Sequence, residues 1–171
     1  MTINFGDGTS IASGGSLGKV LQVVSEHSTG KFTTSSSSYT DVQSKAITPS
    51  SSSSKVLVQV YHSYDFTDNN RFCFLRLNRN GSDIAIGDTE GPAQRCTVDI
   101  SRGHSHNDSV VAFCMMFQFL DSPNSTSSVT YKTRVKLTAG GTAIFGRTGN
   151  VNDGNRSSTI FQMTLTEIAA W

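Results

Sequence analysis

The sequence predicts an all-β protein, an antiparallel β-sandwich of jelly-roll type that follows an extended N-terminal arm. Three observations predict this fold. Apolar residues recur with a period of two, clusters of turn-forming residues separate the apolar runs, and no stretch has the apolar spacing of a helix. The pattern indicates about eight to ten strands without intervening helices, which is typical of a sandwich or jelly roll. The 171 residues are enough for one domain.

The beginning of the chain differs from the rest. Residues 1–18 consist mostly of turn-forming residues, as in FGDGTS and SGGSLG, and contain few side chains that a core could bury. From Lys19 the sequence changes to the apolar, β-branched run KVLQVVSEH. We therefore expect residues 1–18 to form an arm and residues 19–171 to form the β-sandwich.

Four later strands are predicted from alternation, at residues 56–61, 113–120, 131–137 and 159–167. The clearest of them has one basic side, where Tyr131, Thr133, Val135 and Leu137 alternate with Lys132, Arg134 and Lys136. Two serine runs, at 35–38 and 50–54, each lie beside a predicted strand. We expect both runs to be loops within the domain rather than linkers between domains.

The composition limits the classes of function. Charged residues make up only 16% of the chain, against about 25% in an average globular protein, and the net charge is +1. The chain has 26 Ser and 19 Thr, so hydroxyl groups rather than charges keep much of the surface hydrated. No apolar run reaches the roughly 20 residues of a membrane span, and the first residues lack the pattern of a signal peptide. We expect no membrane insertion and no nucleic-acid binding.

The three cysteines are odd in number, are widely spaced and form no CxxC pair. This arrangement indicates neither a disulfide framework nor a zinc finger. Cys73 and Cys114 lie within apolar runs, and we expect both to be reduced core residues.

One motif matches a catalytic pattern. The segment GGSLG at 14–18 fits G-x-S-x-G, with Ser16 in the position of a nucleophile. The catalytic turn requires a strand before the serine and a helix after it, whereas here a Gly/Ser tract precedes and a strand follows. We expect no catalytic residue and no enzymatic activity.

Two histidines raise the question of a metal. His104 and His106 lie two residues apart in SRGHSHND and would point to the same side of an extended segment. On a threefold axis, three such pairs would offer six nitrogens to a transition metal. The alternative is a polar loop with two solvated histidines. We expect the alternative, and therefore no metal site and no cofactor.

The basic stripe formed by Lys132, Arg134 and Lys136 also has two interpretations. It is either a hydrated strand face or a site for a polyanion. We expect the hydrated face.

Several segments in the same order resemble one family of virion proteins. They are INFGDGTSIASGGSLGKVLQVV, ITPSSSSSKVLVQV, RLNRNGSDIAIGD, FQFLDSPNSTSSVTYKTRVK and RTGNVNDGNRSSTIFQMTLTEIAA. These segments are similar to tail-fibre-like structural proteins of tailed bacteriophages, marine ones especially. The resemblance implies a β-rich, trimeric, non-enzymatic part of the virion that is made in the host cytoplasm. It implies no catalytic residues.

The resemblance leads to one expected function and two alternatives. We expect a virion surface protein, at a fibre tip or on a short spike, that attaches to other virion proteins through its arm. A glycan on the host surface is a further candidate partner. One alternative is a capsid decoration protein or head fibre of the same phage. The other is a jelly-roll carbohydrate-binding module, whose mark would be exposed Trp and Tyr beside carboxylates, although Trp171 is the only Trp.

We also expect a homotrimer on physical grounds. The exposed edges of a sandwich invite pairing with other chains, and this chain has few charges on its predicted edges. Trimerisation would cover these edges together with the apolar C-terminus at 168–171, which includes Trp171.

Overall fold

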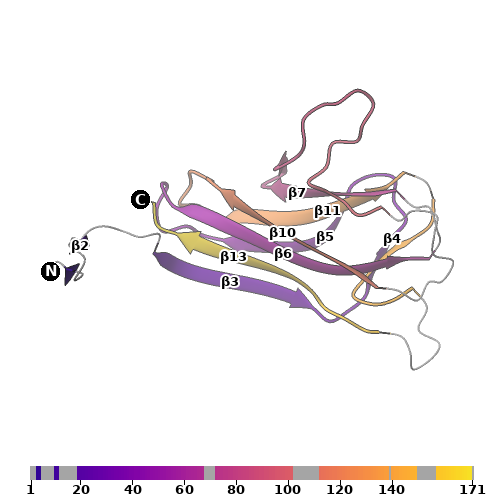
Figure 1. Ribbon diagram of the computed structural model, residues 1–171, viewed down its shortest axis with the longest axis horizontal. Coiled ribbons are helices and arrows are strands. Elements are labelled where there is room, and N and C mark those ends of the chain that lie inside the picture. The colour runs from indigo at the N-terminus through magenta and orange to yellow at the C-terminus, as the bar shows by residue number, and fades with distance from the viewer. Residues whose placement is uncertain are drawn as a thin grey trace.

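The computed structural model shows an all-β protein in which two antiparallel sheets pack face to face (Figure 1). It describes residues 3–4, 10–11, 19–67, 72–101, 112–138, 140–149 and 157–170. These ranges contain no helix. The predicted antiparallel β-sandwich is therefore confirmed, while its jelly-roll connectivity stays a prediction.

The larger sheet has six strands and is organised around its longest one. Its order is β3 (Val20–Ser28), β13 (Phe161–Ile168), β6 (Lys55–Phe66), β12 (Ala143–Phe145) and β4 (Phe32–Thr34), with β10 (Phe113–Asp121) also paired with β6. Strands β13 and β12 follow one another along one edge of β6, and β10 covers the other edge. Strand β6 is thus hydrogen-bonded on both sides.

The smaller sheet has five strands. Its order is β5 (Thr40–Ile47), β11 (Val129–Leu137), β7 (Cys73–Arg79) and β8 (Ser82–Ile84), with β9 (Val98–Asp99) also paired with β7. Two further strands, β1 (Ile3–Asn4) and β2 (Ser10–Ile11), pair with each other and belong to neither sheet. Both lie in the predicted arm. The remainder of residues 1–18 lies outside the described residues, so the arm stays a prediction.

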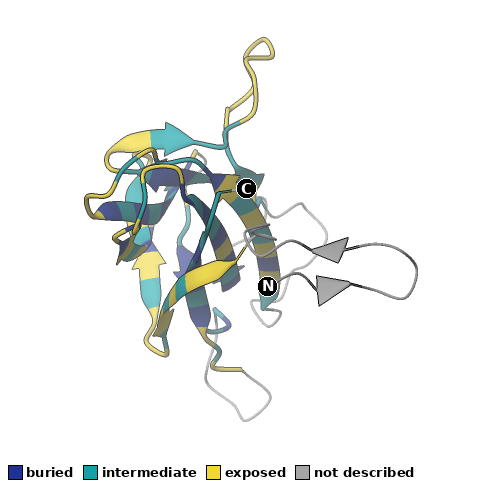
Figure 2. Ribbon diagram, turned by 90° about the vertical axis from the view of Figure 1, so that its left-hand side faces the viewer, coloured by how far each residue is buried: buried dark blue, intermediate teal, exposed yellow. Residues whose placement is uncertain are grey.

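The four strands predicted from alternation are present as β6, β10, β11 and β13, and β3 begins just after Lys19 as expected, whereas β5 and β7 had no predicted position. Along these strands buried and more exposed residues follow one another as bands (Figure 2). Strand β11 buries every second residue, so that its basic residues face away from the core as predicted. The short strands β4, β8, β9 and β12 were not predicted, because two or three residues cannot display a period. The two serine runs lie in turns and loops, as predicted.

The core lies between the facing sides of the two sheets. It is built from aliphatic and aromatic side chains that are less than a tenth exposed, among them Val56, Val58, Val60, Leu75, Leu77, Tyr131, Val135, Met163 and Leu165. The predicted core position of Cys73 is confirmed, because this residue is fully buried. The prediction for Cys114 is wrong, because this residue is exposed. Its neighbours Phe113 and Met115 occupy the core side of β10, and alternation places Cys114 on the opposite side.

Glu167 is the one carboxylate at a core position of β13, and it holds a serine-rich loop in place. The Ser50 backbone N–H and hydroxyl each donate to its Oε1 atom at 2.7 Å, and Gln22 Nε2 donates to Oε2 at 2.6 Å. Burial alone raises the pKa of Glu167, but these hydrogen bonds outweigh burial and bring the pKa to about 2. The ionised carboxylate therefore fastens the 50–54 loop to β13 and β3.

His62 is a fully buried histidine on β6. Its ring stacks on Phe161 with centroids 5.6 Å apart, and it meets the Phe145 ring edge-on at 5.5 Å. Its Nε2 atom shares a hydrogen bond with Thr133 Oγ1 at 3.2 Å, while its Nδ1 atom has no partner among the described groups. Burial lowers the pKa of His62 to about 3, so the imidazole is neutral in the folded protein at physiological pH.

We expect His62 to make the protein lose stability in mild acid. The unfolded chain binds a proton at this residue below about pH 6.5, whereas the folded chain binds it only near pH 3. Each pH unit between these values therefore lowers the free energy of unfolding by up to about 1.4 kcal/mol. Urea unfolding at several pH values should show that the free energy of unfolding of His62→Phe falls less steeply with decreasing pH than that of the wild type. His27→Phe, at an exposed position of β3, is the control. If the free energy of unfolding of His62→Phe falls as steeply as that of the wild type, His62 is not the source of the pH dependence.

Gly146 is a second site where substitution should be costly. Its φ is +84°, and an added Cβ would lie 2.8 Å from the carbonyl oxygen of Gly30. Gly140 also has a positive φ, of +56°, but an added Cβ would meet nothing within 4 Å. Gly146→Ala should therefore lower the free energy of unfolding by roughly 1–3 kcal/mol more than Gly140→Ala. Equal losses in urea unfolding would show that the contact with Gly30 relaxes without cost.

Candidate interaction surfaces

In the larger sheet β3, β13, β6 and β10 are neighbours in this order (Figure 1). Their registers place outward-facing residues in three rows, each with one residue from each of these strands. The rows are Val23, Thr166, Leu57 and Leu120; Ser25, Thr164, Gln59 and Gln118; and His27, Gln162, Tyr61 and Met116. None of these twelve residues, four in each of three rows, is Asp, Glu, Lys or Arg. We call them the neutral face.

Large apolar side chains are exposed on the neutral face. Met116 is 76% exposed, Val23 57% and Leu120 46%. Val20 and Leu21 continue this apolar surface along β3 and are 52% and 40% exposed. The exposed apolar residues thus form two groups, one on β3 and one on β10, with β13 and β6 between them. Scattered single apolar residues are ordinary on a protein surface, whereas groups of them are typical of contact sites.

The polar side chains of the neutral face bond to one another between β3 and β13. Gln162 Nε2 donates to Thr164 Oγ1 at 3.0 Å and to Ser25 Oγ at 3.2 Å. The hydroxyls of Ser25 and Thr164 also share a hydrogen bond at 3.0 Å. Because these groups have partners within the sheet, another protein surface can cover them without leaving them unpaired.

The outer side of the smaller sheet is charged instead. The basic stripe lies there, and acidic residues of the same sheet pair with it. Lys132 Nζ lies 2.6 Å from Asp41 Oδ2, and Arg134 Nε lies 3.0 Å from Asp41 Oδ1. Lys136 Nζ donates to Gln94 Oε1 at 2.7 Å. Exposed pairs of this kind contribute only about 0–1 kcal/mol to stability, so their main effect is to keep this face hydrated.

Tyr39 lies among three of the basic side chains of this charged face. The Arg76 guanidinium carbon lies 4.4 Å from the centre of the Tyr39 ring, Lys136 Nζ 5.2 Å and the Arg134 guanidinium carbon 6.0 Å. Burial raises the pKa of Tyr39. Asp83 pairs with Arg76 at 2.8 Å and lies 3.8 Å from Arg134. The stripe is therefore partly neutralised within its own sheet, which favours a hydrated face over a polyanion site.

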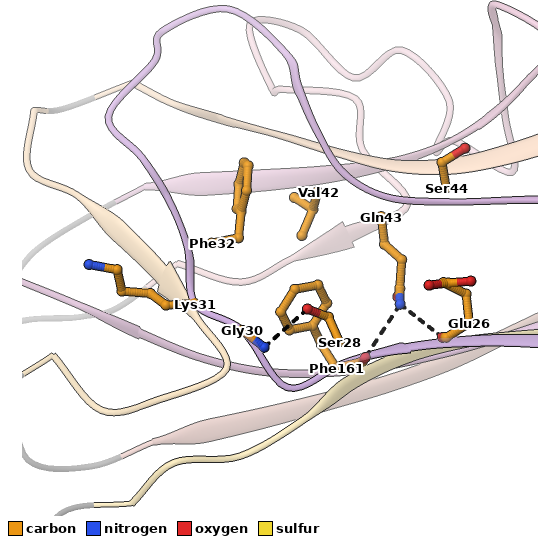
Figure 3. A pocket seen from close by; sticks show the side chains of 9 residues that line it. All are labelled: Glu26, Ser28, Gly30, Lys31, Phe32, Val42, Gln43, Ser44 and Phe161. Carbon is orange, nitrogen blue, oxygen red and sulfur yellow. Dashed lines mark hydrogen bonds between the residues drawn. The ribbon is translucent and has the colours of Figure 1, made fainter.

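A pocket of about 370 Å³ opens at the side of the sandwich, where β3 of one sheet approaches β5 of the other (Figure 3). We call it the seam pocket. Its apolar lining comes from Phe32, Val42 and Phe161. Its polar lining includes Glu26, Lys31 and Gln43. The volume lies within the range of about 300–1,000 Å³ that is common for small-ligand sites.

Several residues singled out in the sequence lie outside the described residues: Ser16, His104, His106 and Trp171. The interpretations of these residues stay predictions. Where the structure is described, no group of three or more His, Cys, Asp or Glu side chains could hold a metal ion. The described part of the chain also contains no helix that is long and apolar enough to cross a membrane.

The sequence reasoning missed both the neutral face and the seam pocket. The neutral face had a signal in the sequence, since the outward positions of these three rows lack charges, although Lys55 lies at the next outward position of β6. The sequence did not show that these four strands are neighbours. The seam pocket had no such signal, because its residues come from β3, β4, β5, β13 and a loop.

Comparison with known proteins identifies no relative: the chain matches no protein-family model, and no curated protein is significantly similar to it.

Proposed function

We propose that this protein is a structural protein of the virion surface of a tailed bacteriophage, tail-fibre-like, and that it assembles into a homotrimer through the neutral face. The observation that carries the proposal is the contrast between the two outer sheet faces. One face has twelve residues without a formal charge, whereas the other has a network of paired charges. The ordered segments that resemble phage structural proteins support the same conclusion.

The neutral face is suited to contact with further copies of the same chain. Burying an ionised side chain at an interface removes its hydration, and this costs free energy unless a partner is well placed. The neutral face brings no such cost, and no like charges would meet when several copies assemble. Interface cores are generally depleted of charged residues and enriched in Met and aromatic residues. The neutral face fits this description, because it has no formal charge and contains Met116 and Tyr61.

The arm and the charged face complete the proposed arrangement. Residues 1–18 attach the trimer to other virion proteins, and the hydrated charged face points outward. A capsid decoration protein or head fibre would use the same surfaces. The number of copies in the particle separates the two locations, because a tail appendage occurs in a few copies and a head protein in tens to hundreds.

Assembly can be tested with lysines placed on one face or the other. The wild-type chain should sediment as a trimer at micromolar concentration. The double substitution Met116→Lys and Leu120→Lys should give a monomer, because three copies would then bring like charges into the interface. Thr130→Lys, on the outer side of β11, should remain trimeric. A monomeric wild type, or a double variant that is still trimeric, would overturn the proposed interface.

The virion role can be tested with purified particles. Quantitative mass spectrometry should detect the protein in them and give its copy number. Deleting residues 1–18 should leave the sandwich folded and abolish incorporation, because the arm supplies the attachment and almost none of the core. If the truncated protein enters particles normally, the arm is not the anchor. If particles contain no copy of the full chain, the virion role is wrong.

A further inference from the structure

The seam pocket has aromatic walls that are held in place from behind. Phe161 is only 3% exposed, and His62 stacks against its ring at 5.6 Å with an angle of 17° between the planes. Phe32 is half-buried and contacts the Phe145 ring, with centroids 6.0 Å apart. In Figure 3 the rings of Phe32 and Phe161 both lie between Lys31 on the left and Gln43 on the right. Because other aromatic rings support both, these walls are preorganised for a ligand.

The polar groups of the pocket are mixed in sign and lie around these rings. Glu26 and Lys31 are at opposite ends of the pocket (Figure 3). The Glu26 side chain is 52% exposed, and its Oε2 atom pairs with Lys45 Nζ at 3.3 Å. The hydroxyls of Ser28 and Ser44 add neutral groups that can both donate and accept hydrogen bonds. The pocket thus offers both hydrogen-bond donors and acceptors, and the charges at its two ends are opposite in sign.

Gln43 forms the inner part of the pocket and connects the two sheets. It is only 6% exposed. Its Nε2 atom donates to the backbone oxygens of Glu26 at 2.9 Å and Phe161 at 3.3 Å (Figure 3). Its Oε1 atom is buried and has no hydrogen-bond donor among the described groups. A buried acceptor without a partner is costly, and a small shift of the amide would allow a hydroxyl in the pocket to donate to it.

From these features we propose that the seam pocket binds one neutral pyranose residue of a polysaccharide. The C–H face of the sugar packs on Phe32, with the nearly buried Phe161 ring behind it, and its hydroxyls bond to Glu26, Ser28 and Gln43. A lipid tail would leave these polar groups unpaired. A phosphate or sulfate would meet the Glu26 carboxylate as well as Lys31, whereas the hydroxyls of a neutral sugar can bond to both. The pocket lies at the seam between the sheets and away from the neutral face, so the proposal does not depend on the virion role or on trimerisation.

The test is an NMR titration of the full chain with four uncharged probes: methyl α-D-glucopyranoside, methyl α-D-mannopyranoside, methyl β-D-galactopyranoside and N-acetyl-D-glucosamine. At least one probe should shift amide signals in residues 26–32 and 42–44. Phe32→Ala should weaken binding about tenfold, because a stacking wall is lost. Glu26→Gln should weaken it to a similar degree, because the charged acceptor is lost. Glu26 is largely exposed, so this variant tests the proposal even if Phe32→Ala does not fold.

Two matched controls lie outside the pocket. Phe72→Ala removes an exposed ring, and Glu90→Gln removes an exposed carboxylate. Both should bind the probe as the wild type does. The double variant Met116→Lys and Leu120→Lys should also bind the probe. Loss of the trimer in this variant would therefore leave the sugar site intact, so the two proposals can fail independently. The proposal is overturned if no probe shifts the pocket signals, if Glu26→Gln binds unchanged, or if D-galacturonate binds in place of the neutral sugars.

Discussion

The register of strand β6 within its sheet is the constraint that organises the molecule. Both edges of β6 are hydrogen-bonded, to β13 and β12 on one side and to β10 on the other. Since side chains alternate along a strand, a slip of one residue would exchange every inward residue for an outward one. The actual register places Val58 and Val60 in the core and Gln59 and Tyr61 outside. It also places His62 against Phe161 and Phe145. The core, the buried histidine and the neutral face all follow from this one set of pairings.

The distribution of charge over the two sheets has a simple physical consequence. A chain with few charges cannot hydrate all of its surface with them, and in this one several charges form a paired network on the outer side of the smaller sheet. There Asp41 and Asp83 lie beside the basic residues of β11 and β7, so attraction within the sheet offsets the repulsion between like charges. The neutral face of the larger sheet carries hydroxyl, amide, imidazole and apolar groups instead. This division allows one face to contact other copies in the proposed trimer while the other stays in water.

The seam between the sheets combines contacts that join the sheets with the proposed sugar site. Gln43 reaches from β5 to backbone oxygens of β3 and β13 and so joins the two sheets at this side. Gly146 allows the chain after β12 to approach the backbone of Gly30 closely, next to the Phe161 ring. Together these contacts hold the walls of the seam pocket in place. The packing that forms the pocket thus also joins the sheets.

The sequence by itself determined the fold class, the positions of β6, β10, β11 and β13, and the side of β11 that faces the core. Alternation is a local property, so the inward side of β11 could be predicted from Tyr131, Thr133, Val135 and Leu137 alone. For the same reason, consistent use of alternation would have placed Cys114 outside. The tertiary structure decided which strands are neighbours, and the candidate sites depend on that. Val23, Leu57, Leu120 and Thr166 form one row only because β3, β13, β6 and β10 pair in that order. Asp41 neutralises Lys132 and Arg134 only because β5 lies beside β11. Pairing between distant strands is set by the packing of the whole chain, and no local pattern in the sequence encodes it.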